Sequence, residues 1–271
     1  MSIMESKVVF IGAGNMAEAI VSGMVAGGFC APEKIIMTDI RPERLADLER
    51  EYGVSISTDN NVVKNAEIVV LAVKPQAMAE VLRGIMPVLR KETLIVSIAA
   101  GIPTAKIEAV LGGKRRVVRV MPNTPALVGQ GASAIAAGTN ADEADLEVTE
   151  NILGCVGLTV RVKEKDLDAV TALSGSGPAY VFYLLEGMLA AADKMGLDKE
   201  TARKLALKTV EGAARLMEDT GEAADVLRAK VTSKGGTTEA AIRSMDEAGV
   251  KDAITQALLA AQKRSIELSN S

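Results

Sequence analysis

Residues 8–17 read VVFIGAGNMA, and this stretch decides how the first half of the chain folds. An apolar run leads into Gly12 and Gly14, and Ala17 stands where a third glycine is common. A G-x-G-x-x-A pattern that follows a strand and opens a helix is typical of the turn that binds a dinucleotide pyrophosphate. A tight strand–helix turn without a ligand is the alternative interpretation of the two glycines.

The apolar runs that follow indicate a parallel sheet with helices on both faces. Strands buried on both faces are almost continuously apolar, because helices cover each side of the sheet. Helical periodicity in 15–27 and 42–52 supplies crossovers between the strands. We therefore expect an α/β fold: a Rossmann-type, doubly wound, mostly parallel sheet followed by an all-helical C-terminal domain. The expected strands are KVVFIGAG, KIIMTDI, AEIVVLAVKP, TLIVSIAAG and RVVRVMPN, with ASAIAAG and GLTVRV extending the sheet.

The composition changes in the second half of the chain. All prolines lie at or before Pro178, and the remainder is rich in Ala, Leu, Glu and Lys. We expect a nucleotide-binding domain at residues 1–162 and a helical domain for substrate binding and dimerisation at residues 163–271. Helical patterns cover 179–195, 199–220, 238–248 and 250–268. Their apolar positions outnumber what a small bundle buries, which favours helix packing between two chains.

Charge and composition exclude several classes of function. The chain has 31 Lys and Arg against 35 Asp and Glu, and without a basic excess neither nucleic acid nor a membrane is expected as partner. The absence of histidine excludes Ser-His-Asp triads and the usual zinc sites, and we expect no metal. Cys30 and Cys155 are interpreted as free thiols, and no signal peptide is recognised, so we expect a cytoplasmic protein.

The end of the second strand bears on the choice of cofactor. Asp39 stands where an acidic residue usually accepts the ribose 2′-OH of NAD. Arg41 and Arg44 follow closely and offer positive charge to the 2′-phosphate of NADP. A solvated helix start is the alternative interpretation of the two arginines. We expect NADP, with NAD as the alternative.

Two proline-containing segments complete the expected cofactor site. In LAVKPQ, Pro75 forces Lys74 out of helical geometry, which predicts a backbone wall beside the ribose and nicotinamide. A simple strand-ending turn is the alternative. In MPNTPALVGQG, two prolines fix the chain and leave Asn123 and Thr124 free to form hydrogen bonds at the nicotinamide. A rigid connector is the alternative there.

A second glycine-rich segment, KVTSKGGTTEAAIR, runs from residue 230 to 243. Gly235 and Gly236 expose amide groups at a helix start, where an anion binds without a charged side chain. Ser233, Thr237 and Thr238 add hydroxyl groups. A simple N-cap with a flexible entry is the alternative. The segment therefore predicts a carboxylate site.

The segment SGSGPAY, residues 174–180, begins the first long helix of the second half. Gly175 and Gly177 allow a close backbone approach, so we expect the floor of a substrate pocket that includes Ser176. A helix start packed against the first domain is the alternative interpretation of the serines.

Together these motifs resemble the pyrroline-5-carboxylate reductase family. The resemblance implies reduction of Δ1-pyrroline-5-carboxylate to L-proline by hydride transfer from NADPH or NADH, and a homo-oligomer that is a dimer or a ring of dimers. It extends from Val8 to about Met245. The segments that carry it, in the family's order, are IGAGNM, LAVKPQ, SIAAGI, RVMPNTPALVGQG, DAVTALSGSGPAYVF and VTSKGGTTEAAI.

The resemblance also implies roles for individual residues. Thr238 is the expected catalytic residue, which orients the iminium nitrogen rather than acting as a strong acid. Family members commonly have SPGGT where this chain has SKGGT, so Lys234 either loosens the loop or adds a cation near the substrate carboxylate. The expected substrate-binding residues are Ser176, Ser233, Gly236, Thr237 and Thr238. The expected cofactor-binding residues are Gly12, Gly14, Asn15, Met16, Asp39, Arg41, Asn60, Ala72, Val73, Lys74, Pro75 and Asn123.

Two other functions fit part of the sequence. A reductase of the 3-hydroxy acid dehydrogenase type needs a lysine in the long inter-domain helix, but AYVFYLLEGMLAAADKMG has none before Lys194. A non-catalytic nucleotide sensor would keep the first glycine motif without needing the second. The second glycine segment therefore argues against a sensor.

Overall fold

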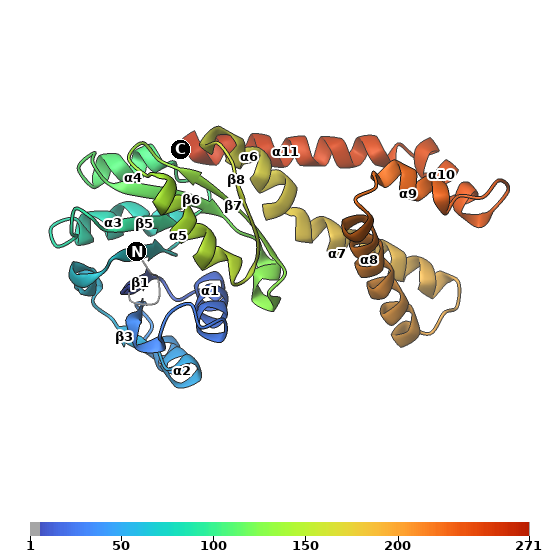
Figure 1. Cartoon of the computed structure of the whole chain (residues 1–271). Coiled ribbons are helices and arrows are strands. Elements are labelled where there is room, and N and C mark those ends of the chain that lie inside the picture. The colour runs from blue at the N-terminus through green and yellow to red at the C-terminus, as the bar shows by residue number, and fades with distance from the viewer. Residues whose placement is uncertain (1–5, 271) are drawn as a thin grey trace. The chain divides into compact units, whose positions relative to one another are not determined.

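A computed structural model describes residues 6–270 and divides the chain into two compact units (Figure 1). The first unit runs up to Ser176 and includes the residues from Ala261 onward, and the second unit is Gly177–Ala260. Each unit is described by itself below.

In the described chain the first unit is built on a sheet of eight strands in the order β3-β2-β1-β4-β5-β6-β7-β8. Adjacent strands of this sheet are parallel, except that β6 and β7 are antiparallel to each other. The mostly parallel, doubly wound fold is thereby confirmed, while the short β3 was not expected. The bounds are β1 Val8–Ile11, β2 Ile35–Thr38, β3 Ser55–Ser57, β4 Ile68–Leu71, β5 Leu94–Ser97, β6 Arg116–Met121, β7 Gly131–Ala137 and β8 Gly157–Arg161.

Helices cover both faces of this sheet. Val8 and Phe10 of β1 belong to one buried cluster, with side chains of α1 (Asn15–Ala26), α2 (Pro42–Tyr52) and α5 (Glu143–Gly154). Val9 and Ile11 point to the opposite face and join a second cluster, with α3 (Pro75–Ile85) and α4 (Thr104–Val110). Because successive residues alternate between covered faces, such strands are almost continuously apolar. Each such fully buried side chain contributes about 1.5–3 kcal/mol.

Short helical segments complete the first unit. They are η2 Pro32–Lys34, η3 Asn60–Asn65, η4 Thr124–Val128, η5 Glu164–Asp166, α6 Leu167–Val170 and the π-helical turn η6 Thr171–Gly175. The last residues of α11 (Val250–Asn270) also belong here, and Ser265 donates a 2.6 Å hydrogen bond to Asp168 of α6.

The second unit is helical, as expected. It contains α7 Gly177–Lys194, α8 Lys199–Thr220, α9 Ala224–Lys230, α10 Thr237–Glu247 and the first part of α11 Val250–Asn270. Its buried side chains are alanines, whereas Phe182 and Tyr183 are 60% and 78% exposed. The expected surplus of apolar surface is thus confirmed for the single chain. Among residues 6–270, no helix combines the length and apolarity that a membrane crossing requires.

Candidate functional site

The glycine-rich turn lies between β1 and α1, and its two glycines differ in backbone conformation and in surroundings. Gly12 has φ +99°, and a Cβ there would lie 2.6 Å from the carbonyl oxygen of Ala72, so both backbone and neighbour require glycine. Gly14 has an ordinary φ of −74°, and a Cβ there would meet nothing within 4 Å. Gly14 precedes α1, and no side chain caps that helix. The first amides of α1 are therefore available to an anion beside open space.

The wall expected at the end of β4 lies directly beside this turn. Ala72 donates its amide to the carbonyl of Ile11 over 2.8 Å, and backbone atoms of Ala72 and Val73 surround the Cα of Gly12. Lys74 is extended, as predicted, and Pro75 is the first residue of α3. Since β1 stands between β2 and β4, these carboxyl ends meet where the strand order reverses, which is where dinucleotides bind in this fold.

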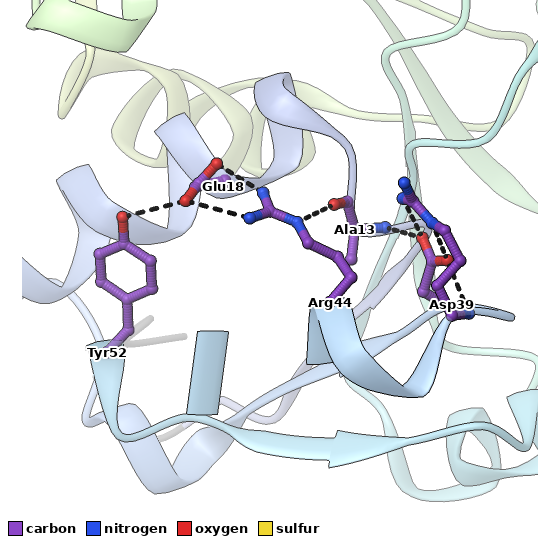
Figure 2. A network of polar contacts seen from close by, with 6 residues as sticks. Ala13, Glu18, Asp39, Arg44 and Tyr52 are labelled. Atoms are coloured by element: carbon purple, nitrogen blue, oxygen red, sulfur yellow. Dashed lines mark hydrogen bonds and ion pairs between the residues drawn. The ribbon is translucent and has the colours of Figure 1, made fainter. Parts of the chain in front are cut away.

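Asp39, which follows β2, is fully engaged within the chain (Figure 2). Its Oδ2 accepts the amide of Ala13 at 2.9 Å and Nη2 of Arg41 at 3.0 Å. Its Oδ1 accepts the amide of Arg41 at 3.0 Å and Nε of Arg41 at 2.9 Å. A carboxylate has about four lone-pair sites, so none is left for a ribose hydroxyl.

The ion pair sets the charge of Asp39. The side-chain hydrogen bond from Arg41 is the largest cause that lowers the pKa of Asp39, to about 2, although burial opposes the shift. The carboxylate is therefore ionised at neutral pH. Its side chain is 10% exposed, whereas that of Arg41 is 58% exposed, so the arginine forms the solvent side of the pair.

Arg44 is paired within the chain. Its Nε donates to the carbonyl of Ala13 at 3.0 Å, and its two terminal nitrogens contact Glu18 of α1. Tyr52 donates its hydroxyl to the same carboxylate at 3.3 Å, so Glu18 joins α1 to both ends of α2 (Figure 2). The interpretation of Arg44 as a solvated helix start is therefore wrong, because its guanidinium is paired within the chain, while its contact with a phosphate stays a prediction.

Asn60 and Asn123 are the two asparagines expected at the cofactor. Asn60 begins η3, and its Oδ1 accepts the hydroxyl of Thr38 at 2.6 Å, which places its amide group at the end of β2. No residue among 6–270 accepts a hydrogen bond from its Nδ2, so that donor is available.

Asn123 is 9% exposed. The sequence predicted that its side chain would be free to bind a ligand, but both ends of its amide group form hydrogen bonds within the chain. Its Nδ2 donates to the carbonyl of Ser174 at 3.1 Å, and its Oδ1 accepts the amide of Ala132 at 2.8 Å. Asn123 therefore links η4, β7 and the π-helical turn. Its contact with the nicotinamide stays a prediction.

The turn before Ser176 is π-helical, a conformation that is frequent at functional sites. Ser176 donates its amide to the carbonyl of Thr171 at 2.8 Å. A Cβ on Gly175 would lie 2.5 Å from the terminal methyl of the Met121 side chain, and the role of Gly175 in a substrate pocket stays a prediction. Gly177, by contrast, has nothing within 4 Å of a built Cβ.

In the second unit, Ser233–Gly236 forms a tight turn. Gly236 donates its amide to the carbonyl of Ser233 at 3.0 Å, and Gly235 has φ +73°. A positive φ at the third position is the mark of a type II turn, in which proline is common at the second position. Lys234 occupies that second position and is exposed, so the turn forms without the proline.

The amides that remain at this helix start differ from those expected. Gly235 donates to Oε2 of Glu239 at 2.7 Å, and Gly236 donates within the turn, so neither glycine offers its amide. No side chain caps α10, which leaves the first helical amides, those of Thr237 and Thr238, open to a ligand. The expectation that the glycines themselves supply the donors is therefore wrong.

Sequence reasoning missed several residues of these networks, including Glu18, Tyr52 and Glu239. Glu239 carried a usable signal, because a Glu at the third helical position commonly reaches back to the start of its helix. Glu18 and Tyr52 carried none, since their contacts join residues far apart in the chain. Among residues 6–270, no group of three or more Cys, Asp or Glu is arranged to hold a metal ion.

Two family models match the chain. Residues 7–101 match the model described as NADP oxidoreductase, coenzyme F420-dependent. Residues 164–268 match the model described as pyrroline-5-carboxylate reductase dimerisation.

Relatives match over almost the whole length. The pyrroline-5-carboxylate reductase of Pseudomonas aeruginosa is 46% identical over 265 residues, which is 97% of both chains. The solved structure of a pyrroline-5-carboxylate reductase from Coxiella burnetii is 40% identical, with a TM-score of 0.92 over 98% of this chain and 99% of that one. The pyrroline carboxylate reductase of Plasmodium falciparum, solved with NADP bound, is 29% identical, with a TM-score of 0.89 over the same shares.

Proposed function

The chain belongs to the pyrroline-5-carboxylate reductase family, and we propose that it reduces the imine of Δ1-pyrroline-5-carboxylate to L-proline with NAD(P)H, the last step of proline biosynthesis. One observation in the structure carries this proposal. In the described residues, α1 and α10 each follow a glycine that has no side-chain cap hydrogen bond, and each lies in one of the two glycine-rich segments that the sequence singled out. Amides at such positions bind anions, and the reaction needs two anionic groups held, a pyrophosphate and a carboxylate.

The turn at α1 fits a dinucleotide. The open space at Gly14 admits a pyrophosphate, and the uncapped amides of α1 would hold it. When bound, NAD(P)H supplies the hydride, and the chain supplies position and electrostatics. NADP is the proposed cofactor, with NAD accepted as well. The residues that would hold it are Gly12, Gly14, Asn15, Met16, Arg41, Asn60, Ala72, Val73, Lys74, Pro75 and Asn123, while Asp39, whose acceptor sites are filled within the chain, would support the site through Ala13 and Arg41.

The turn at α10 fits the substrate carboxylate. The amides of Thr237 and Thr238 and their hydroxyls are the proposed donors, and Ser233 adds a third hydroxyl. A Cβ on Gly236 would lie 2.5 Å from Oγ of Ser233, so glycine keeps that serine in place. Ser176 is proposed as a further contact of the small ring.

The chemistry explains why a chain without histidine suffices. The imine nitrogen must hold a proton when the hydride arrives, and an iminium formed in solution brings that proton with it. Thr238 is proposed to orient the iminium nitrogen, because its hydroxyl is too weak an acid to protonate it. Reacting atoms must be held roughly 3–3.5 Å apart, so orientation is the main contribution of the chain.

We also propose a role for each of two domains. Residues 1–162 form the NAD(P)-binding domain, and residues 163–271 form the domain for substrate binding and dimerisation. The exposed apolar helices of the second unit support a homo-oligomer, with a dimer or a ring of dimers as the finer proposal. A cytoplasmic location is proposed from the two unpaired cysteines, Cys30 and Cys155.

A spectrophotometric assay tests the function directly. The purified full-length chain is mixed with NADPH or NADH and Δ1-pyrroline-5-carboxylate, and oxidation of the cofactor is followed as proline is quantified. Equal amounts of proline formed and cofactor oxidised are expected. Absence of turnover at saturating substrate, in a preparation that still binds NADPH, would refute the proposal.

A further inference from the structure

The two peptide groups that flank Ala13, inside the glycine-rich turn, are each held by a residue that follows β2. Asp39 accepts its N–H at 2.9 Å, and Arg44 donates to the neighbouring carbonyl of the same residue at 3.0 Å (Figure 2). Both partners lie more than twenty residues along the chain, so these contacts are not local turn chemistry. They fix the orientation of the backbone immediately before Gly14.

Arg44 is itself fixed. Its terminal nitrogens are paired with Glu18, and Tyr52 donates to the same carboxylate. Arg44 therefore serves the turn, and its charge is neutralised by Glu18. Of the two arginines after β2, Arg41 is the more exposed, at 58% against 24% for Arg44, and it has more unused N–H groups in the described chain.

Arg41 still has donors to offer. A guanidinium carries five N–H groups in a planar fork, and Arg41 uses two of them, one on Nε and one on Nη2, for Asp39. Three N–H groups stay unused, among them both on Nη1, and the side chain is 58% exposed. Because Asp39 holds one edge of the fork, the other edge is oriented before any ligand arrives. Such an edge suits the two oxygens of a phosphate.

We propose that Arg41 is the specificity-determining residue for a dinucleotide with a 2′-phosphate on its adenosine ribose, and that Asp39 is a positioning residue that holds Arg41 and the Ala13 peptide. This inference deepens the proposed function and rests on it. It reverses the usual role of an acid at the end of the second strand, which is to accept the 2′-OH. All four acceptor sites of Asp39 are filled by Ala13 and Arg41, which is the reason for the reversal.

Binding of cofactor fragments tests the inference without requiring turnover. Adenosine 2′,5′-bisphosphate and 5′-AMP differ by the 2′-phosphate alone, and calorimetry gives the dissociation constant of each with the full-length chain. The wild type is expected to bind the bisphosphate at least tenfold more tightly, which corresponds to about 1.4 kcal/mol. Arg41→Gln is expected to remove that advantage and to leave 5′-AMP affinity within twofold of wild type.

Arg50→Gln is the matched control. Arg50 is likewise an exposed arginine paired with an aspartate, but it lies in the last turn of α2 whereas Arg41 precedes the first turn, so its removal changes the net charge equally at the other end of the helix. It is expected to leave the tenfold advantage intact. Asp39→Asn is expected to weaken both fragments, since the turn serves the part they share, and also to reduce the advantage of the bisphosphate, because Arg41 is no longer held in place.

Three results would overturn the inference. One is equal affinity of the wild type for the two fragments. Another is the same loss of the bisphosphate advantage in Arg50→Gln as in Arg41→Gln. The third is a loss in Asp39→Asn that is confined to the fragment with a free 2′-OH. Because fragment binding is measured apart from turnover, a chain that reduces the imine but lacks the preference refutes only this inference.

Discussion

Alanine at Gly14 separates the binding role of the glycine-rich turn from its role in folding. Gly14 has φ −74°, and a Cβ there meets nothing within 4 Å, so alanine fits the free enzyme without strain. We expect the free energy of unfolding to change by less than about 1 kcal/mol. The methyl group instead occupies the space where a pyrophosphate approaches the amides. Loss of one charge-assisted hydrogen bond costs about 1.5–3 kcal/mol, which raises the Kd for NADPH roughly 10- to 150-fold.

Gly12→Ala is the contrasting variant. At φ +99° an alanine is strained by about 1–2 kcal/mol, and its Cβ would lie 2.6 Å from the oxygen of Ala72, a backbone atom that no rotamer change removes. We expect a loss of about 3 kcal/mol or more, hence a Tm lowered by roughly 6–12 °C. Gly28→Ala controls for backbone strain alone, because Gly28 has φ +65° with nothing within 4 Å of its Cβ.

Calorimetric binding of NADPH and thermal unfolding are measured for all three variants at one protein concentration. Gly14→Ala should lose affinity and keep its Tm, whereas Gly12→Ala should lose more Tm than Gly28→Ala. If Gly14→Ala binds NADPH as tightly as wild type, the turn does not hold the pyrophosphate at this position.

Three further predictions concern the second turn and the ion pair. Thr238→Ala should reduce kcat/KM about tenfold or more with unchanged NADPH affinity, while Thr238→Ser should keep most of the activity. Both variants are measured by steady-state kinetics. A parallel loss of NADPH affinity in Thr238→Ala would indicate misfolding instead. Lys234→Pro should raise the free energy of unfolding by about 0.4–1 kcal/mol in denaturant titrations, since proline suits the second position of the Ser233–Gly236 turn; destabilisation would show that the turn is not type II. The pKa of Asp39 is lowered from 3.8 to about 2, mainly by its hydrogen bond from Arg41, so its contribution, on the order of 2 kcal/mol, is full above pH 4 and lost as pH falls toward 2. The stability advantage of wild type over Asp39→Asn should therefore shrink over that range, and an advantage independent of pH would contradict the assignment.

The sheet was predictable because its strands have one simple requirement. A strand covered on both faces is almost continuously apolar, and five such runs occur before residue 122, although β6 carries the buried Arg119. β3 was not predicted from the sequence, because Ser55–Ser57 is three residues long, half-buried and mostly polar. α9 was missed for a related reason, since Ala224–Lys230 is too short to show a helical period clearly.

The glycines of the site were predictable, but the state of its polar side chains was not. A glycine in a turn often indicates that the backbone there adopts a positive φ, which can be inferred from neighbouring residues alone. Gly12 and Gly235 both have positive φ. Whether an acceptor is occupied depends on residues brought together by the fold. Asp39 meets an amide 26 residues away, and Asn123 meets a carbonyl 51 residues away. No local pattern signals such a contact.

The helical unit differs from the first unit in what holds it together. In the first unit, side chains as large as Phe10 and Leu71 are fully buried within one chain, whereas the buried side chains of the second unit are Ala192, Ala202 and Ala206. In the proposed homo-oligomer, exposed residues such as Phe182 each gain about 1.5–3 kcal/mol on burial, so the stability of this unit depends on chain concentration. Substitutions at the α10 turn can therefore lower activity through association as well as through substrate binding. A lost substrate contact shows itself as a change in kcat/KM that persists when the chain is concentrated enough to restore the oligomer.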